Sequence, residues 1–139
     1  MKLVVMDGQG GGMGRALVEQ IKRAWPVQSV LCVGTNAMAT AAMLKAGADA
    51  GATGENAVLV NCRDADIIVG PIGIVLADAL LGEVTPGMAA AVSRSGALKI
   101  LIPQSKCHVR VVGAQGMTLN LAAAEAVELI RAVMRESED

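Results

Sequence analysis

The chain has 139 residues, with 12 basic and 13 acidic side chains and a formal net charge of -1 at pH 7. It has no basic stripe, and Trp25 is its only aromatic residue, so it lacks the charge and the stacking surface that nucleic-acid binding requires. The most apolar stretch, residues 67–82, is interrupted by glycine, proline and aspartate and is shorter than the ~20 residues of a membrane-spanning helix. We therefore expect neither nucleic acid nor a membrane as a partner.

The cysteines and the N-terminus indicate a cellular compartment. Three cysteines without a CxxC pair are typical of reduced thiols, and the chain opens with a strand-like run instead of a signal peptide. These features predict a cytoplasmic protein. Its length is that of one domain, which we place over residues 1–139.

Apolar runs and helical periodicity alternate along the first half of the chain. The predicted elements are a strand over 2–6, a helix over 14–25, a strand over 29–33, a helix over 37–47, a loop over 48–56 and a short helix over 56–65. Pro26 closes the first of these helices, and Thr35 or Asn36 is suited to cap the second.

The second half continues with more strands and helices. We predict a strand over 66–70, a helix over 71–82, a helix over 86–96, strands over 97–103 and 108–113, and a long helix over 118–136. The link of residues 104–107 is too short for a crossover helix, so we expect the last two strands to be antiparallel or splayed.

Strands that are continuous apolar runs and mostly alternate with helices indicate a mainly parallel sheet covered on both faces. The expected fold class is therefore α/β. We predict a single three-layer Rossmann-like domain with about five strands and with helices on both faces of the sheet.

The sequence DGQGGGMG, residues 7–14, places five glycines between the first strand and the first helix. A glycine-rich turn into a helix N-terminus exposes backbone N–H groups that attract phosphate. No register fits GxGxxG, and no Gly-Lys-Ser/Thr follows, which excludes a Walker A loop. We predict a nucleotide-binding loop made of Gly8, Gln9, Gly10, Gly11, Gly12, Met13 and Gly14. The alternative is a tight turn that packs backbone on backbone.

Two further segments are expected to line the same site, because the carboxyl ends of parallel strands meet at one edge of a sheet. Thr35 and Asn36 follow the second strand, where NAD-binding domains usually carry a carboxylate. The absence of a carboxylate favours NADP over NAD and leaves a mononucleotide or another phosphorylated ligand open. The alternative is that Thr35 and Asn36 only cap a helix. A turn containing Gly70, Pro71 and Gly73 is expected to form the far wall.

Residues able to carry chemistry are scarce. If acid–base chemistry occurs, Glu55 and Asp49 are the best-placed carboxylates; the alternative is that both are solvated loop or cap residues. Asp7 is expected to orient the turn, and the alternative is that it holds a metal-bound phosphate. His108 is the only histidine, which leaves little for a metal site or a histidine-based triad, so we predict no metal. Whether the protein is an enzyme stays open.

Five segments, DGQGGGMG, GTNAMATAAMLKAGAD, GATGENAVLVN, ADIIVGPIGIV and GEVTP, together resemble a small bacterial family of about this length that is catalogued as a domain of unknown function. The resemblance implies a free-standing cytoplasmic Rossmann-like domain and assigns no catalytic residue.

The sequence thus predicts a protein that binds a nucleotide or dinucleotide, with NADP as first choice, through residues 8–14. A minimal oxidoreductase would need its substrate half from a partner protomer, and the apolar, Met- and Ala-rich composition makes a homodimer the expected assembly. The alternatives are a module that senses a nucleotide without chemistry and a protein-interaction module.

Overall fold

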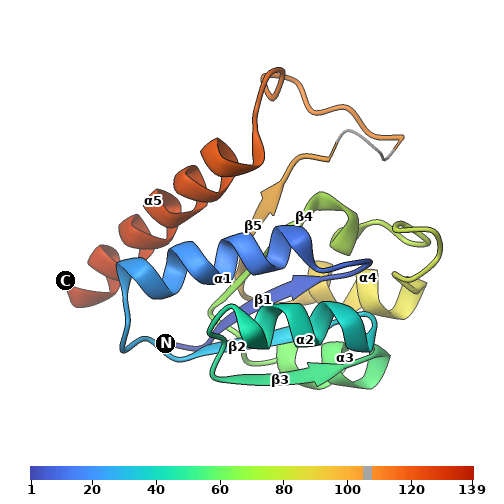
Figure 1. Ribbon diagram of the computed structural model, residues 1–139, viewed down its shortest axis with the longest axis horizontal. Coiled ribbons are helices and arrows are strands. Elements are labelled where there is room, and N and C mark those ends of the chain that lie inside the picture. The colour runs from blue at the N-terminus through green and yellow to red at the C-terminus, as the bar shows by residue number, and fades with distance from the viewer. Residues whose placement is uncertain (105–107) are drawn as a thin grey trace.

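The computed structural model describes residues 1–104 and 108–139. Its elements are β1 (Leu3–Asp7), α1 (Gly12–Ala24), β2 (Val30–Gly34), α2 (Ala37–Lys45), β3 (Ala50–Thr53), α3 (Glu55–Cys62), β4 (Ile67–Pro71), the 3-10 helix η1 (Ile72–Val75), α4 (Pro86–Arg94), β5 (Leu98–Ile102) and α5 (Leu119–Glu138). The five strands form one sheet in the order β3-β2-β1-β4-β5, and every pairing is parallel (Figure 1).

Helices cover both faces of this sheet. In β1, Leu3 and Val5 pack under α1, α2 and α5, whereas Val4 and Met6 face α3 and α4. All residues of β1 are buried, which explains a run of apolar residues without alternation. The three-layer α/β Rossmann-like fold expected from the sequence is confirmed.

The strand order reverses beside β1. The chain moves outward from β1 through β2 to β3, then crosses back to place β4 on the other side of β1. At such a reversal the loops that follow the two central strands diverge, and ligands of open α/β sheets bind in the crevice between them. The glycine-rich segment follows β1 and therefore lies at this point.

The predicted loop over 48–56 is wrong in part, because residues Ala50–Thr53 form β3. Three of these four residues are glycine or alanine, which have little intrinsic strand preference, and pairing with β2 decides their conformation. Gly51 fits because a Cβ there would lie 2.9 Å from Cys32 Sγ. The short helix predicted next is confirmed as α3.

The helix predicted over 71–82 is also wrong. Only η1 is helical, and Asp78, Leu80 and Leu81 then have φ angles of 66°, 56° and 57°. Left-handed residues cannot continue a right-handed helix. We call residues 76–84 the covering loop, because Leu80 reaches Gly8: a Cβ added at Gly8 would lie 2.7 Å from Leu80 Cδ1.

The strand predicted over 108–113 does not form, and β5 pairs with β4 alone within the described residues. The predicted link over 104–107 lies mostly outside those residues. The segment 108–118, called the arm here, projects from the layers and leads into α5 (Figure 1). Val112 on the arm is 97% exposed, so its apolar run finds no place in the sheet.

Helix α5 returns along α1 and docks by its alanine-rich face. At the far end of α1, the guanidinium carbon of Arg131 lies 5.0 Å from the centroid of the Trp25 ring, a cation–π contact. Within residues 1–104 and 108–139, no helix combines the length and the apolar character needed to span a bilayer.

Candidate functional site

The segment of residues 8–14, called the glycine loop here, joins β1 to α1 at the carboxyl edge of the sheet. Its turn closes through a hydrogen bond of 3.0 Å from the Gly11 N–H to the Gly8 carbonyl. Gln9 and Gly11 both have positive φ angles, 52° and 76°, and glutamine tolerates this conformation poorly. The loop is therefore held in its shape by surrounding contacts.

Three of its five glycines are required by packing within the chain. A Cβ at Gly8 would lie 2.6 Å from Thr35 Oγ1, and one at Gly11 would lie 2.8 Å from the Cα of Ala39 on α2. A Cβ at Gly14 would lie 2.5 Å from the sulfur of Met43. These three positions bear out the turn alternative, in which glycine serves close packing.

Gly10 and Gly12 differ from those three. A Cβ added at either position meets no atom within 4 Å. Within residues 1–104 and 108–139, neither backbone N–H has a hydrogen-bond acceptor. Internal packing therefore gives no reason for glycine at these two positions, and both leave room for a ligand to approach the backbone.

Asp7 organises the loop from beneath. Its side chain is 4% exposed, and its two carboxylate oxygens accept hydrogen bonds of 2.7 Å from the N–H groups of Gly8 and Gly14. Burial raises the pKa of Asp7 although these hydrogen bonds oppose the shift. Because Gly14 lies in the first turn of α1, an internal carboxylate already satisfies part of the positive helix end. The orienting role predicted for Asp7 is confirmed by these contacts.

Thr35 and Asn36 come together with the glycine loop, but their donors are occupied. Thr35 Oγ1 donates to Glu83 Oε1 at 3.1 Å, and Asn36 Nδ2 donates to the same oxygen and to the Gln9 carbonyl. Asn36 Oδ1 also caps α2 by accepting from the Ala39 N–H, as the helix-cap alternative requires.

Glu83, in the covering loop, is a site residue that sequence reasoning missed. Its carboxylate also accepts the Gln9 N–H at 3.1 and 3.2 Å. Partial burial alone raises the pKa of Glu83, but hydrogen bonds from Asn36, Gln9 and Thr35 outweigh it, so the pKa lies below its ordinary value. Glu83 lies 47 residues after Asn36, and no local pattern marks it as a partner of the β2 end.

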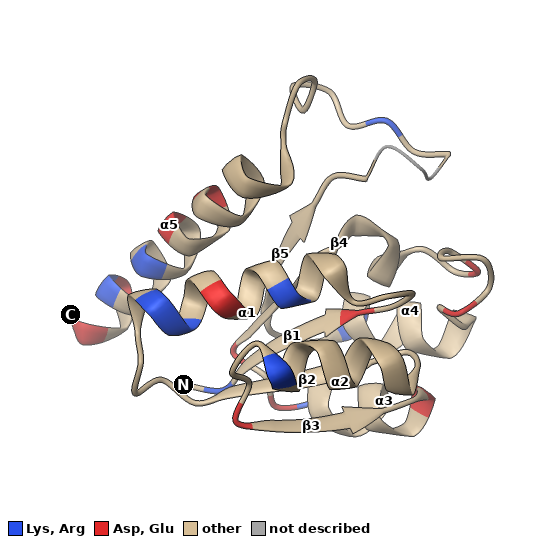
Figure 2. Ribbon diagram, viewed as in Figure 1, with Lys and Arg blue, Asp and Glu red and all other residues tan. Residues whose placement is uncertain are grey.

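The glycine loop also borders a cavity of about 990 Å³ over the ends of β1 and β4, called the crevice here. Its lining comprises Asp7, Gly8, Gln9, Gly10, Gly11, Gly12, Met13, Val75, Leu76, Ala77, Asp78, Ala79, Leu80, Leu81, Gln104, His108 and Val109. Figure 2 shows acidic and no basic segments along the covering loop, which forms one wall.

The turn of Gly70, Pro71 and Gly73, predicted as the far wall of the site, does not line the crevice. Gly70 and Pro71 are buried in β4, where a Cβ at Gly70 would collide with the Met6 carbonyl oxygen. The N–H of Gly73 donates to Gln104 Oε1 at 3.3 Å. None of the three lines the crevice; they position Val75 and the residues after it, which do.

The predicted carboxylates lie elsewhere. Asp49 is at the opposite edge of the sheet, where it accepts from the Val30 N–H at 2.8 Å and from Lys22 Nζ at 3.0 Å. Those contacts, the Val30 N–H first, lower its pKa. Glu55 begins α3 and faces Gly87 on α4. In the part of the chain that the structure describes, no three His, Cys, Asp or Glu side chains form a cluster that could hold a metal.

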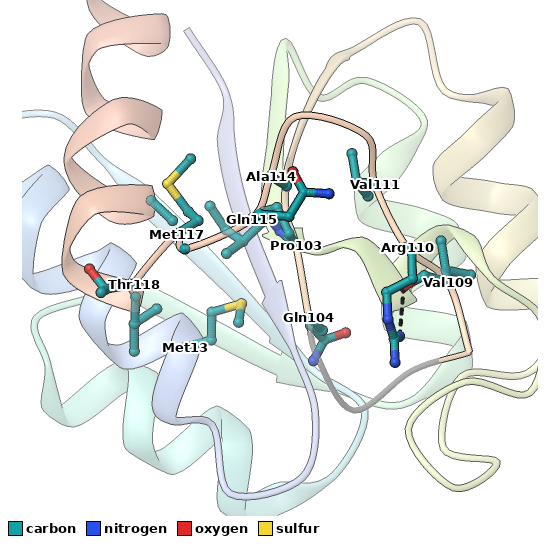
Figure 3. A pocket seen from close by; sticks show the side chains of 14 residues that line it. Met13, Pro103, Gln104, Val109, Arg110, Val111, Ala114, Gln115, Met117 and Thr118 are labelled. Carbon is teal, nitrogen blue, oxygen red and sulfur yellow. Dashed lines mark hydrogen bonds between the residues drawn. The ribbon is translucent and has the colours of Figure 1, made fainter.

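A second cavity, of about 520 Å³, lies between β5, the arm and the start of α5. Figure 3 shows Met13, Met117 and Thr118 on one side and Gln104 and Arg110 on the other. It shares Met13, Gln104 and Val109 with the crevice, so the two cavities adjoin. The arm thus borders both of them.

Comparison with known proteins identifies the family of the chain. No curated protein matches the chain. A crystal structure of a dodecameric FMN-dependent UbiX-like decarboxylase from Escherichia coli O157:H7 is similar, with 22% sequence identity and a TM-score of 0.46 over 94% of this chain and 76% of that one. A family model matches residues 2–135, and the chain therefore belongs to the domain of unknown function family DUF3842.

Proposed function

We propose that the protein binds a compact phosphorylated ligand of mononucleotide size in the crevice, with a phosphate on the N–H groups of Gly10 and Gly12. The observation that carries this proposal is the contrast among the glycines: two of the five have no packing reason to be glycine, and both line the crevice. Unpaired N–H groups at the entrance of a helix favour an anion.

The size of the crevice supports a compact ligand. Pockets for small molecules have volumes of roughly 300 to 1,000 Å³ and combine apolar walls with a few polar groups. The crevice has about 990 Å³, and its lining includes leucines and alanines together with Gln104 and His108. These two side chains are the polar groups best placed to orient the rest of the ligand.

NADP, the first choice from sequence, is the weaker candidate. In a dinucleotide-binding domain the second nucleotide lies beyond the end of the second strand. Here Leu80 and Glu83 cover that end of the strand, and the Glu83 carboxylate beside Thr35 must be displaced before a phosphate can bind there. A nucleotide confined to the β1–β4–β5 side avoids this conflict.

The test is a titration of the purified protein with AMP, FMN, NAD and NADP, followed by calorimetry and thermal unfolding. A ligand of the native state stabilises it by about 2.7 kcal/mol at 100 times its dissociation constant. The Gly12→Val variant should keep the melting temperature of the free protein and lose the ligand-induced rise, because the added side chain enters open space.

The matched control is Gly14→Val, which adds the same atoms on the packed side of the loop and should lower the melting temperature without ligand. If no nucleotide binds the wild type, or if Gly12→Val binds as well as the wild type, the proposal is wrong. The protein-interaction alternative would then be favoured, with Leu81, 96% exposed at the crevice wall, as its first candidate contact.

A further inference from the structure

The covering loop holds a carboxylate against three donors that belong to other elements. Glu83 accepts from the Gln9 backbone N–H, from Thr35 Oγ1 and from Asn36 Nδ2. Gln9 lies on the glycine loop, and the other two follow β2. Such convergent donors suit any anion with two or three acceptor oxygens, and a carboxylate of the chain itself holds that place here.

This group of donors is continuous with the proposed phosphate site. Gln9 and Gly10 are neighbours in the chain, and Gln9 has a left-handed φ of 52°. Successive N–H groups around a left-handed residue form a concave nest that binds anions. The Gln9 N–H points to Glu83, whereas that of Gly10 has no acceptor among the described residues. A ligand with two linked anionic groups would therefore span both positions.

The covering loop contains backbone strain. Asp78, Leu80 and Leu81 are non-glycine residues with positive φ, which bulky side chains adopt only under constraint. Its ends are anchored: Ile74 and Val84 are fully buried, and Thr85 caps α4. Between these anchors the segment is hydrogen-bonded within itself, from the Asp78 N–H to the Val84 carbonyl and from the Val84 N–H to the Ala79 carbonyl, so it is one compact unit.

Resting on the binding site proposed above, we propose that Glu83 occupies a second anion subsite made of Gln9, Thr35 and Asn36, and that a pyrophosphate-bearing ligand such as a nucleoside diphosphate displaces it. The second phosphate takes the three donors. Displaced Glu83 releases the covering loop, which relieves the strain at its left-handed residues. A monophosphate binds at Gly10 and Gly12 and leaves the loop closed.

Hydrogen–deuterium exchange of the full chain tests this inference, with inorganic phosphate, inorganic pyrophosphate, AMP and ADP as probes. AMP should slow exchange in residues 8–14 and leave residues 76–84 unchanged. ADP and pyrophosphate should slow exchange in 8–14 and speed it at least several-fold in 76–84. Slower exchange in both segments with ADP would mean that the loop closes over the ligand, and the inference would be overturned.

The variant Glu83→Gln removes the charge of the occupant. Without ligand it should speed exchange in residues 76–84, and it should bind pyrophosphate several-fold more tightly than the wild type. If it binds more weakly, Glu83 is a ligand contact and not a stand-in, which overturns the inference. The matched control is Glu125→Gln, which makes the same charge change on the exposed face of α5 and should alter neither property.

A second substitution separates anion binding at the subsite from the role of Glu83 in holding the covering loop. Thr35→Val, added to Glu83→Gln, keeps the shape of the side chain and removes one donor, so it should reverse the gain in pyrophosphate affinity while AMP binding is unchanged. Unchanged pyrophosphate binding would overturn the subsite. If AMP binds the wild type but ADP never opens the loop, this inference alone fails. If no probe binds even Glu83→Gln, the site proposed above fails with it.

Discussion

The two sides of the glycine loop are built from the same backbone and have opposite surroundings. On the β2 side, Gly8 and Gly11 contact Thr35 and α2, and the Gln9 N–H is paired with Glu83. These two glycines also line the crevice, as Gly10 and Gly12 do, but an added Cβ would meet open space only at Gly10 and Gly12. The number of glycines does not distinguish a packing role from a binding role. The two roles are distinguished by the atoms that a Cβ added at each glycine would contact.

The largest difference is expected between alanine substitutions at two neighbouring glycines. Gly11→Ala places a Cβ 2.8 Å from the Ala39 Cα and forces alanine into a left-handed conformation. We expect it to lower the free energy of unfolding by about 2 kcal/mol or more. Gly10→Ala meets nothing and should change it by less than about 1 kcal/mol. Urea denaturation of both variants checks the difference, and equal losses would contradict it.

The next largest effect is expected beneath the loop. Asp7→Asn replaces one of two accepting oxygens with an NH₂ group, so the N–H of Gly8 or of Gly14 loses its acceptor in a buried place. We expect a loss of roughly 1 to 3 kcal/mol in the free energy of unfolding. Asp78→Asn, exposed and left-handed, is the control and should cost nothing, because asparagine tolerates that conformation.

Glu83 and Asp7 also give the stability of the fold opposite dependences on pH. The pKa of Glu83 is lowered in the fold, so its contribution to stability is complete above the ordinary value of 4.5 and is lost as the pH falls through the lowered value. The raised pKa of Asp7 acts in the opposite sense: stability falls as the pH rises from 3.8 through its raised value.

Glu83→Gln should therefore lose less stability than the wild type when the pH is lowered into the acid range. Thermal unfolding across that range checks this expectation. A wild type and a variant with parallel pH profiles would show that the Glu83 contacts contribute nothing to the closed state.

The smallest effect on stability is expected on the arm. Val112 is 97% exposed, so Val112→Asp should leave the free energy of unfolding within about 0.5 kcal/mol of the wild type. The predicted homodimer would bury such apolar residues against a second copy. Light scattering should then show a dimer that the substitution converts to a monomer; a monomeric wild type would contradict the homodimer.

Much of the fold could be predicted from sequence because local patterns and tertiary structure agree there. The run KLVVM gives β1, and α1 buries Gly14, Leu17, Val18 and Ile21 at helical spacing. The failures lie where tertiary contacts decide. Strand β3 is set by its partner strand. The covering loop follows an apolar pattern that suits a helix, yet Asp78, Leu80 and Leu81 are left-handed, and Leu80 packs on Gly8.

The candidate site follows the same division. The position of the glycine loop at the carboxyl edge could be predicted from a strand followed by a helix, and so could its proximity to Thr35 and Asn36. Glu83 could not, because a contact over 47 residues leaves no local signal. The sequence predicts Gly70, Pro71 and Gly73 as the adjoining wall. They lie before Val75 and the residues after it, which line the crevice in their place.

The contact between Trp25 and Arg131 makes the protein its own optical probe. Trp25 is the single aromatic residue, so all of the intrinsic fluorescence arises at the seam between α1 and α5. That seam lies at the end of α1 away from the glycine loop. A change in Trp25 emission during denaturation therefore reports the separation of α5 from α1. Because the crevice is remote from Trp25, a nucleotide can be titrated there with a nearly constant protein fluorescence.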